Sequence, residues 1–367
     1  MSRVMRDFFD VDDETIVSLA GVEEIGPIYW NKIKKSFGSL SEFIKTPHHQ
    51  LHQLLPDKQV GALTDRQKAR PLPKSIKLLT LSSPDYPELL KQMPDPPLWL
   101  FVVGNVGLLN SPTISIVGSR KHTAYAKEAI NKLVTASVAK ELTIVSGLAY
   151  GIDKLAHQKS IDSGGQTIAV LAGGLDKIYP LGHRHIAKQI VQLGGTVISE
   201  YPPGSPAYAY RFPIRNRIIA GLSRATIVVE AAIKSGSMTT ARSAIDYNRE
   251  LFAVPGDVTK LSSEGCNYLI SQGATPLIDP IQLSDFYNIS VEDEALLDQT
   301  GNPPVDLHSP VAFSDNALEL LADGSGLSID QLAEKSGLSV DALLRQLTML
   351  ELSGKIYQER PGYFKTK

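Results

Sequence analysis

Cysteine is nearly absent from this sequence of 367 residues, which contains only Cys266. A single cysteine excludes an internal disulfide framework and a thiolate metal cluster within one chain, and we expect it to be a small buried hydrophobe. Long apolar runs are also missing, since no stretch approaches the roughly 20 apolar residues of a membrane-spanning helix. The start, MSRVMRDFFDVDDE, turns acidic where a signal peptide would have its apolar region. These absences predict a cytoplasmic protein that has no membrane partner.

Several signatures of catalysis and of cofactor binding are missing as well. The sequence has no GxxxxGK[ST], GxSxG or HExxH motif, and no GxGxxG follows the first predicted strand of its central region. The histidine pairs His48/His52 and His183/His185 have spacings that a metal could use, but no run of further ligands lies near either. Acidic residues of the central region are scattered singly, so no paired acid and base is predicted. We therefore expect no enzyme, no cofactor and no metal.

The formal net charge of -2 conceals an uneven distribution along the chain. Residues 111–260 contain 18 Lys and Arg against 10 Asp and Glu, which leaves 19 against 29 in the rest. A basic centre between acidic flanks is expected of a nucleotide-binding or nucleic-acid-binding protein, and charge alone does not distinguish the two.

The chain is longer than one hydrophobic core usually grows, which predicts two or three domains. Residues 1–70 have the pattern of short helices around the turn Ile25-Gly26-Pro27, as in a small helix-hairpin-helix or SAM-like domain. We favour a structural role for this turn over a phosphate contact. Residues 71–111 are rich in proline and predict a linker that packs on the core.

The C-terminal part is predicted to be a separate small domain. Residues 281–309 are acidic and close with Asn-Pro-Pro, which suits a linker. Residues 310–367 contain three helix patterns followed by a two-stranded ribbon over Pro361-Gly362. Three helices and a hairpin predict a winged-helix-like domain.

The central residues 112–280 alternate short β-branched apolar runs with segments of helical length. Continuous apolar runs are typical of strands covered on both faces, so this pattern predicts an α/β, Rossmann-like, doubly wound and mostly parallel sheet. Ligands of such sheets bind at the carboxyl ends of the strands. The six predicted strands lie in TISIVGS, LTIVSG, TIAVLAG, GTVISEY, ATIVVEA and ELFAVPG.

Turns with small residues, hydroxyls and basic side chains follow several of these strands. Together they predict an anion site built from helix N-termini, although tight packing alone could explain any one turn. The candidate contacts in these turns are Ser119, Arg120, Ser146, Gly147, Lys177, Lys234 and Ser237.

A second basic feature is the segment RFPIRNRII, which contains Arg211, Phe212, Arg215, Asn216 and Arg217. A helix that begins near Pro213 would bury part of its face against the sheet, so we expect some of these arginines to point toward the sheet edge. The alternative is that the arginines pair with the acidic flanks.

The motifs GSR, SGLAYGIDKLAH, AGGLDKIYP, ISEYPPG, FPIRNRIIAGLS, VVEAAIKSGSMTTA, FAVPGD and GCNYLISQGA occur in order between residues 118 and 275. This set resembles the DNA-processing protein A family, also called DprA or Smf. The resemblance implies a Rossmann-like homodimer that binds and protects single-stranded DNA and helps load the RecA recombinase during natural transformation and recombination. It implies no metal or nucleotide cofactor.

The resemblance also implies which residues form the site. The family's basic pocket corresponds to Arg120, Lys177 and the Arg215-Asn216-Arg217 run, and its turns correspond to Ser119, Ser146, Gly147 and Ser237. One departure is visible, since many members have an asparagine after Tyr179-Pro180 where this chain has Leu181-Gly182-His183. The aromatic residues that could stack on bases are Tyr179, Tyr208, Tyr210 and Phe212.

Two other functions remain open. A phosphoribohydrolase-like enzyme has the same core. The sequences of such enzymes contain a PGGxGT pattern followed by a catalytic glutamate. This chain has Lys234-Ser235-Gly236-Ser237-Met238-Thr239-Thr240 in that place. A protein adaptor that acts through the winged-helix-like segment is the second alternative, because that segment is not basic enough to favour DNA reading.

Overall fold

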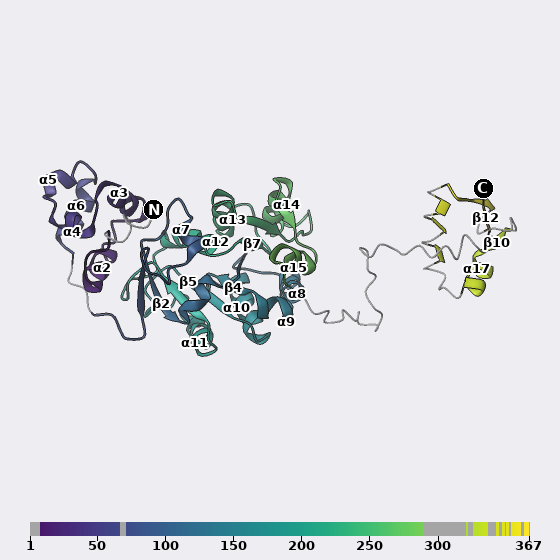
Figure 1. The fold of residues 1–367 in the computed structure, drawn as a ribbon, viewed down its shortest axis with the longest axis horizontal. Coiled ribbons are helices and arrows are strands. Elements are labelled where there is room, and N and C mark those ends of the chain that lie inside the picture. The colour runs from purple at the N-terminus through teal and green to yellow at the C-terminus, as the bar shows by residue number, and fades with distance from the viewer. Residues whose placement is uncertain are drawn as a thin grey trace. The chain divides into compact units, whose positions relative to one another are not determined.

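The computed structural model describes residues 8–66, 71–289, 321, 326–336, 343–344, 347–348, 350–351, 354–360 and 363–366. The chain divides into two compact units, residues 1–292 and 293–367. The N-terminal helices therefore belong to the same compact unit as the large sheet. Figure 1 shows the order of the elements along the chain.

The six strands predicted from the apolar runs are all present and are joined by parallel pairing, which confirms the α/β, doubly wound fold. The sheet has nine described strands in the order β1-β2-β6-β5-β4-β3-β7-β8-β9. The predicted strands are β3 (Thr113–Val117), β4 (Thr143–Ser146), β5 (Thr167–Leu171), β6 (Thr196–Ser199), β7 (Ala225–Val228) and β8 (Glu250–Ala253). A short β9 (Thr275–Pro276) extends the parallel part beyond β8.

Helices cover both faces of this sheet, as Figure 1 shows. The crossover segments form α8 (Ala124–Leu133), α9 (Ala136–Glu141), α10 (Ile152–Asp162), α11 (Arg184–Gln192), α12 (Arg211–Gly221), α13 (Ser237–Asp246) and α14 (Glu264–Ser271), with η2 (Leu181–His183) before α11. Alternate residues of β3 face opposite helix layers, because Ile114 and Ile116 pack in the cluster with α8 and α10 whereas the Ser115 hydroxyl donates to the Ile219 carbonyl of α12 at 2.7 Å. Alternation of this kind is what a strand buried on both faces requires.

The proline-rich segment 71–111 is not a linker, which corrects the prediction made from its prolines. It contributes β1 (Lys77–Thr80) and β2 (Trp99–Gly104) to the sheet, with α7 (Glu88–Lys91) between them and η1 (Val106–Asn110) after β2. β2 pairs antiparallel with both β1 and β6. The prolines lie between these elements, so they did not exclude strands on either side of them.

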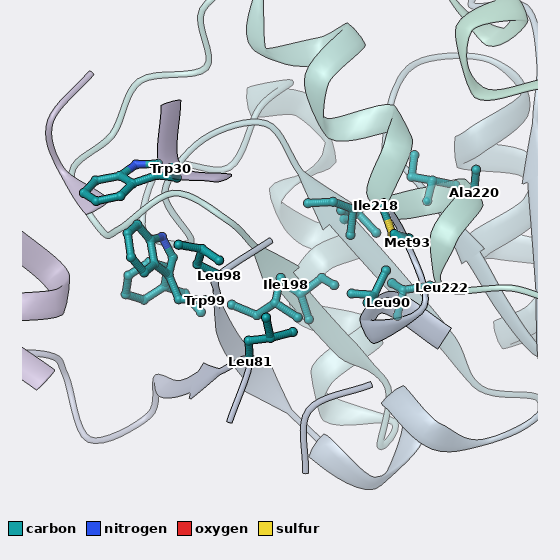
Figure 2. Packing of buried hydrophobic residues seen from close by; sticks show 14 of the residues in the cluster. Trp30, Leu81, Leu90, Met93, Leu98, Trp99, Ile198, Ile218, Ala220 and Leu222 are labelled. Carbon is teal, nitrogen blue, oxygen red and sulfur yellow. The ribbon is translucent and has the colours of Figure 1, made fainter. Parts of the chain in front are cut away.

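The N-terminal part contains the helices α2 (Asp13–Ala20), α3 (Pro27–Ser36), α4 (Leu40–Lys45), α5 (His48–Leu51) and α6 (Asp57–Thr64). It packs directly on the sheet through Trp30, whose ring centroid lies 4.9 Å from that of Trp99. Figure 2 shows this contact. Farther along the same core it shows Leu90 and Met93 beside Leu222, the residue that follows α12. Whether these helices form a helix-hairpin-helix or SAM-like domain stays a prediction.

Part of the segment predicted to be an acidic linker is structured. Residues 281–287 form α15 (Ile281–Tyr287), in which Leu283 and Tyr287 are buried against the sheet layer. The Tyr287 hydroxyl donates to the Thr113 carbonyl at 2.7 Å. The first linker residues therefore complete the core, and residues 290–309 lie outside the described part of the chain.

The second unit contains β10 (Leu327–Ser328), α17 (Ile329–Ser336), β11 (Ile356–Arg360) and β12 (Tyr363–Thr366). The three strands pair in the order β10-β12-β11, and β11 and β12 are the predicted ribbon on either side of Pro361-Gly362. The middle predicted helix is α17, whereas most of the first predicted helix lies outside the described residues.

Cys266 is fully buried, and its thiol lies 3.4 Å from the Val228 carbonyl oxygen. Burial raises the pKa of the thiol to about 12, which agrees with the predicted role as a small buried hydrophobe. No helix in the described parts of the chain is long and apolar enough to cross a membrane.

Candidate nucleic-acid interface

The strand order reverses between β3 and β7, and the turns that follow these two strands are joined. The Ser119 N–H donates to the Glu230 carbonyl at 2.6 Å, and the Glu230 carboxylate accepts the Thr123 N–H at 2.9 Å. The carboxyl ends of strands at such a reversal form the usual ligand crevice of an open α/β sheet. The predicted site residues lie around this crevice.

Arg120 is an exposed cation at this edge. Its guanidinium carbon lies 5.3 Å from the ring centroid of Phe212, at the start of α12. The Phe212 ring in turn meets the exposed ring of Tyr179 edge to face, at 5.5 Å between centroids. One cation and two aromatic rings, from the turn after β3, the segment after β5 and the start of α12, therefore lie together.

Lys177 and Lys234 are also exposed at strand ends. The ammonium of Lys177 donates to the Gly204 carbonyl at 2.9 Å, which holds its side chain along the loop after β6. Lys234 lies in the turn between β7 and α13. Both residues present positive charge to solvent at the same edge of the sheet as Arg120.

The turn after β4 is filled from within by a carboxylate. Asp153 Oδ2 accepts the N–H groups of Gly147 at 3.1 Å and of Ala149 at 3.3 Å. The Ser146 hydroxyl is buried and donates to the Ile116 carbonyl at 2.6 Å. Burial raises the pKa of Asp153, while the nearby Arg215 lowers it. Ser146 and Gly147 therefore shape this turn, and their polar groups are not available to a phosphate.

Arg215 is a buried anchor of the site. Its guanidinium donates to the Gly147 carbonyl at 2.7 Å and also to the Val170 carbonyl, so it ties the ends of β4 and β5 together. Desolvation lowers its pKa to about 10, against the opposing effect of Asp153. The same guanidinium lies 5.9 Å from the Phe212 ring centroid. Arg215 thus faces the sheet edge as predicted, but beneath the aromatic ring and not at the surface.

Asn216 joins α12 to the turn after β7. Its side-chain amide donates to the Gly236 carbonyl at 3.1 Å and to the Thr239 hydroxyl at 2.9 Å, and its Oδ1 accepts from Arg215 Nε at 3.2 Å. The Ser237 hydroxyl is buried beside the Ser235 hydroxyl at 2.7 Å. The hydrogen bonds of Asn216, Ser235 and Ser237 therefore fix the conformation of the turn that carries Lys234.

Arg217 does not belong to the exposed edge. It is buried, and it donates to the Glu200 carboxylate at 2.5 Å and to the Asp95 carbonyl at 2.9 Å. We therefore withdraw the phosphate contact that the sequence analysis assigned to it. The alternative that the sequence left open was pairing with the acidic flanks. It holds in part, because the Arg217 guanidinium lies 3.7 Å from the carboxylate of Asp95 in a flank, whereas Glu200 belongs to the basic centre.

Arg211 is likewise buried, and it pairs with Glu23 of the N-terminal part at 3.4 Å. Its guanidinium also donates to the Pro206 carbonyl at 2.9 Å. With its charge engaged in this way, Arg211 is not a phosphate ligand. It connects the helical N-terminal part to the beginning of α12.

Ser119 is satisfied inside its own turn, because its hydroxyl donates to the Lys121 carbonyl at 2.9 Å and accepts the Lys121 N–H at 3.1 Å. This arrangement fixes the backbone that directs Arg120 and Lys121 outward. The side chain of Ser119 thus acts on the turn, and its neighbours provide the charge.

The sequence analysis missed Tyr150, an exposed aromatic residue in the turn after β4. Its ring packs edge to face on His183 at 4.8 Å. The sequence did contain a signal for this residue, namely an aromatic side chain inside a glycine-rich strand-to-helix turn, where small residues suffice for packing. His183 is buried, with Nδ1 2.8 Å from the Leu148 carbonyl oxygen.

The pair His48/His52 has ordinary partners. His52 lies 2.8 Å from a carboxylate oxygen of Asp57, and His48 lies beside the Thr64 hydroxyl. Within the described residues no group of three His, Cys, Asp or Glu side chains is placed to hold a metal ion.

Known proteins resemble this chain over most of its length. Residues 77–288 match the sequence model of the family described as DNA recombination-mediator protein A, and residues 312–361 match the DprA winged helix domain. Protein Smf of Escherichia coli is 39% identical over 306 residues, which cover 79% of this chain and 77% of that protein. The DNA processing protein DprA of Streptococcus pneumoniae is 42% identical over 189 residues, which cover 52% of this chain and 66% of that protein.

Two solved structures resemble the fold. The X-ray structure of DprA from Streptococcus pneumoniae matches with a TM-score of 0.64 at 29% identity, and covers 77% of this chain and 99% of that chain. The structure of DprA from Helicobacter pylori, which concerns its single-stranded DNA binding mode, matches with a TM-score of 0.52 at 30% identity. The match covers 59% of this chain and 97% of that chain. The second family match confirms the predicted winged-helix domain in the C-terminal region. The chain belongs to the DNA recombination-mediator protein A family, whose members are also named DprA or Smf.

Proposed function

We propose that this protein binds single-stranded DNA along the carboxyl edge of its large sheet. The observation that carries the proposal is the contact of exposed Arg120 with Phe212, whose ring also meets Tyr179. A cation beside one exposed and one half-buried ring offers a phosphate contact and a stacking surface at one place, and this combination suits a strand whose bases are unpaired. The relative from Helicobacter pylori, which is described as binding single-stranded DNA, supports the same assignment.

The exposed cations of this edge set the expected salt dependence. Arg120, Lys121, Lys177 and Lys234 are exposed at the ends of β3, β5 and β7. If each neutralises one phosphate, the logarithm of the affinity falls with the logarithm of salt concentration at a slope of about -3, from about -0.7 for each contact. Arg215 and Asn216 hold the ring and the turn behind these cations.

We infer that the protein acts by binding and not by catalysis. The turn from Lys234 to Thr240 contains no glutamate, which disfavours the phosphoribohydrolase-like alternative. Release of base from nucleoside monophosphates by the purified protein would revive that alternative.

The cellular function that we propose is the protection of incoming single strands and the loading of the RecA recombinase, during natural transformation and recombination in the cytoplasm. The active species is a homodimer. Family membership supports these points. Sedimentation of the purified protein checks the dimer. Assembly of RecA on strands coated with a single-strand-binding protein, with and without this protein, checks the loading step.

The test of DNA binding is a fluorescence-anisotropy titration with a labelled 35-base oligonucleotide, single-stranded and duplex, at several salt concentrations. Arg120→Ala and Lys177→Ala should weaken binding to all sequences alike and make the salt slope shallower. Lys140→Ala is the matched control, because Lys140 is exposed near the end of α9, just before β4 begins and so at the opposite edge of the sheet. Absence of binding at low salt would refute the proposal, as would equal losses in Lys140→Ala.

A further inference from the structure

The loop between β6 and α12 ends in two exposed tyrosines that lie nearly parallel. The rings of Tyr208 and Tyr210 are 5.7 Å apart between centroids with an interplanar angle of 15°. The two residues remain 41% and 53% exposed. Exposed aromatic rings held in parallel present flat faces to solvent next to the start of α12, where Phe212 lies.

A buried arginine holds these rings. The guanidinium carbon of Arg211 lies 5.1 Å from the Tyr208 centroid, 5.7 Å from the Tyr210 centroid and 4.2 Å from the centroid of Tyr201. A guanidinium attracts the faces of aromatic rings within about 6 Å, so one cation orients all three tyrosines. Because Glu23 pairs with the same guanidinium, the surface that remains for a ligand is aromatic and not cationic.

The backbone of the loop is fixed to the DNA-binding edge at several points. The Gly204 N–H donates to Asp176 at 2.7 Å, and the Gly204 carbonyl accepts from Lys177 at 2.9 Å. The Ser205 carbonyl accepts the Gly174 N–H at 2.9 Å, and the Pro206 carbonyl accepts from Arg211. The loop that presents Tyr208 and Tyr210 is therefore tied to the turn that carries Lys177.

We propose that Tyr208 and Tyr210 form a second base-stacking position for the single strand, and that Arg211 is the positioning residue that holds it. The inference rests on the proposed function. The occupant is an unpaired base of the strand that contacts Arg120 and Phe212. Rings that are already oriented lose little conformational freedom on binding, and each base that stacks on them adds affinity irrespective of its identity.

This position is distinguishable from the cationic edge by its response to salt. Stacking on uncharged rings neutralises no phosphate, so removal of the rings lowers affinity at every salt concentration and leaves the salt slope unchanged. We expect Tyr208→Ala/Tyr210→Ala to weaken binding of a 35-base oligothymidine by at least about fivefold. The control Tyr208→Phe/Tyr210→Phe keeps the rings and should bind like the unmodified protein.

A tryptophan placed in the pair reports the contact directly. The sequence contains only two tryptophans, Trp30 and Trp99, and both are buried in the core. In the full-length Tyr210→Trp protein, the added indole should be quenched on addition of oligothymidine. In the double variant Tyr210→Trp/Arg211→Gln the quenching should be smaller. The slope of log affinity against log salt concentration, to which Arg120 contributes, should remain unchanged. If Arg211→Gln lowers the melting temperature strongly, Glu23→Gln tests the same pairing from its exposed partner.

The outcomes separate this inference from the proposed function. No anisotropy change with any oligonucleotide refutes the proposed function and the stacking position with it. Binding without quenching, together with full affinity of Tyr208→Ala/Tyr210→Ala, overturns the stacking position alone. Full DNA affinity with loss of RecA loading in that variant would mean that a protein occupies the tyrosine pair, and this too overturns the inference.

Discussion

Gly147 and the guanidinium of Arg215 are in such close contact that a β-carbon at position 147 would lie 2.6 Å from three guanidinium atoms. Arg215 cannot withdraw freely, because it donates to the Gly147 and Val170 carbonyls and is only 4% exposed. The glycine in this turn is thus required by the arginine that closes over it. A phosphate approaching the backbone would need the same space.

Gly147→Ala should therefore lower the free energy of unfolding by about 1 to 3 kcal/mol, the usual effect of overpacking a filled interior. Denaturant unfolding measures the change. Gly61→Ala is the matched control, since Gly61 lies inside α6 and a β-carbon there meets nothing within 4 Å. Relief of the helix penalty of glycine should make that variant more stable by about 0.4 to 1 kcal/mol. Equal behaviour of the two variants would contradict the packing argument.

The sequence predicted the strands of the central sheet well because each is a short apolar run buried on both faces. It did not predict β1 and β2, since their segment is dominated by prolines that lie between the strands. Arg120 and Lys177 lie exposed at the sheet edge where the strand-end rule placed them, and their contacts with DNA stay a prediction. DNA contacts were also predicted for Arg211 and Arg217, but both are buried in ion pairs. Their carboxylate partners Glu23 and Glu200 lie elsewhere in the sequence, and only the folded chain brings them close.

Arg217→Ala should destabilise the fold and leave the exposed edge intact. The change leaves the Glu200 carboxylate, whose side chain is only 12% exposed, without its partner, which costs about 3 to 5 kcal/mol in comparable buried pairs. Thermal or denaturant unfolding should show this loss, and anisotropy below the melting temperature should show nearly unchanged DNA affinity. Arg120→Ala is expected to behave in the opposite way, with normal stability and weak binding. A stable Arg217→Ala protein that fails to bind DNA would restore Arg217 to the interface.

His157 makes stability sensitive to mild acid. Its Nδ1 lies 2.7 Å from the Thr167 hydroxyl, which itself donates to the Ile144 carbonyl, so Nδ1 carries the proton and the buried Nε2 is left without a hydrogen-bond partner. Desolvation, with smaller effects of Arg215 and His183, lowers its pKa from 6.5 to about 3. Between pH 6.5 and about 3, the unfolded chain therefore binds a proton at His157 that the folded chain does not bind. The stability contributed by neutral His157 is complete above pH 6.5 and is lost as the pH falls toward 3.

The size of this effect is about 1.4 kcal/mol per pH unit for one proton. Unfolding free energies measured from pH 7 to pH 4 should fall more steeply for the unmodified protein than for His157→Asn, whose amide can still bond Thr167 but does not titrate. The comparison between the two proteins removes the contribution of carboxylates. Parallel pH curves would show that another group is responsible.

Phe212 should contribute to DNA binding through its ring and not merely through its volume. Its ring lies within 6 Å of both Arg120 and Arg215 and contacts Tyr179, so it links the exposed cation to the buried one. Phe212→Leu keeps an apolar side chain but removes the aromatic face, and it should weaken binding of single-stranded DNA by about 1 to 3 kcal/mol for the loss of one stacked base. Phe212→Tyr preserves the face and should bind normally. Because Phe212 is only partly buried, the melting temperature of both variants should remain close to that of the unmodified protein. If Phe212→Leu binds as tightly as Phe212→Tyr, the ring only supports Arg120, and the bases stack elsewhere on this edge.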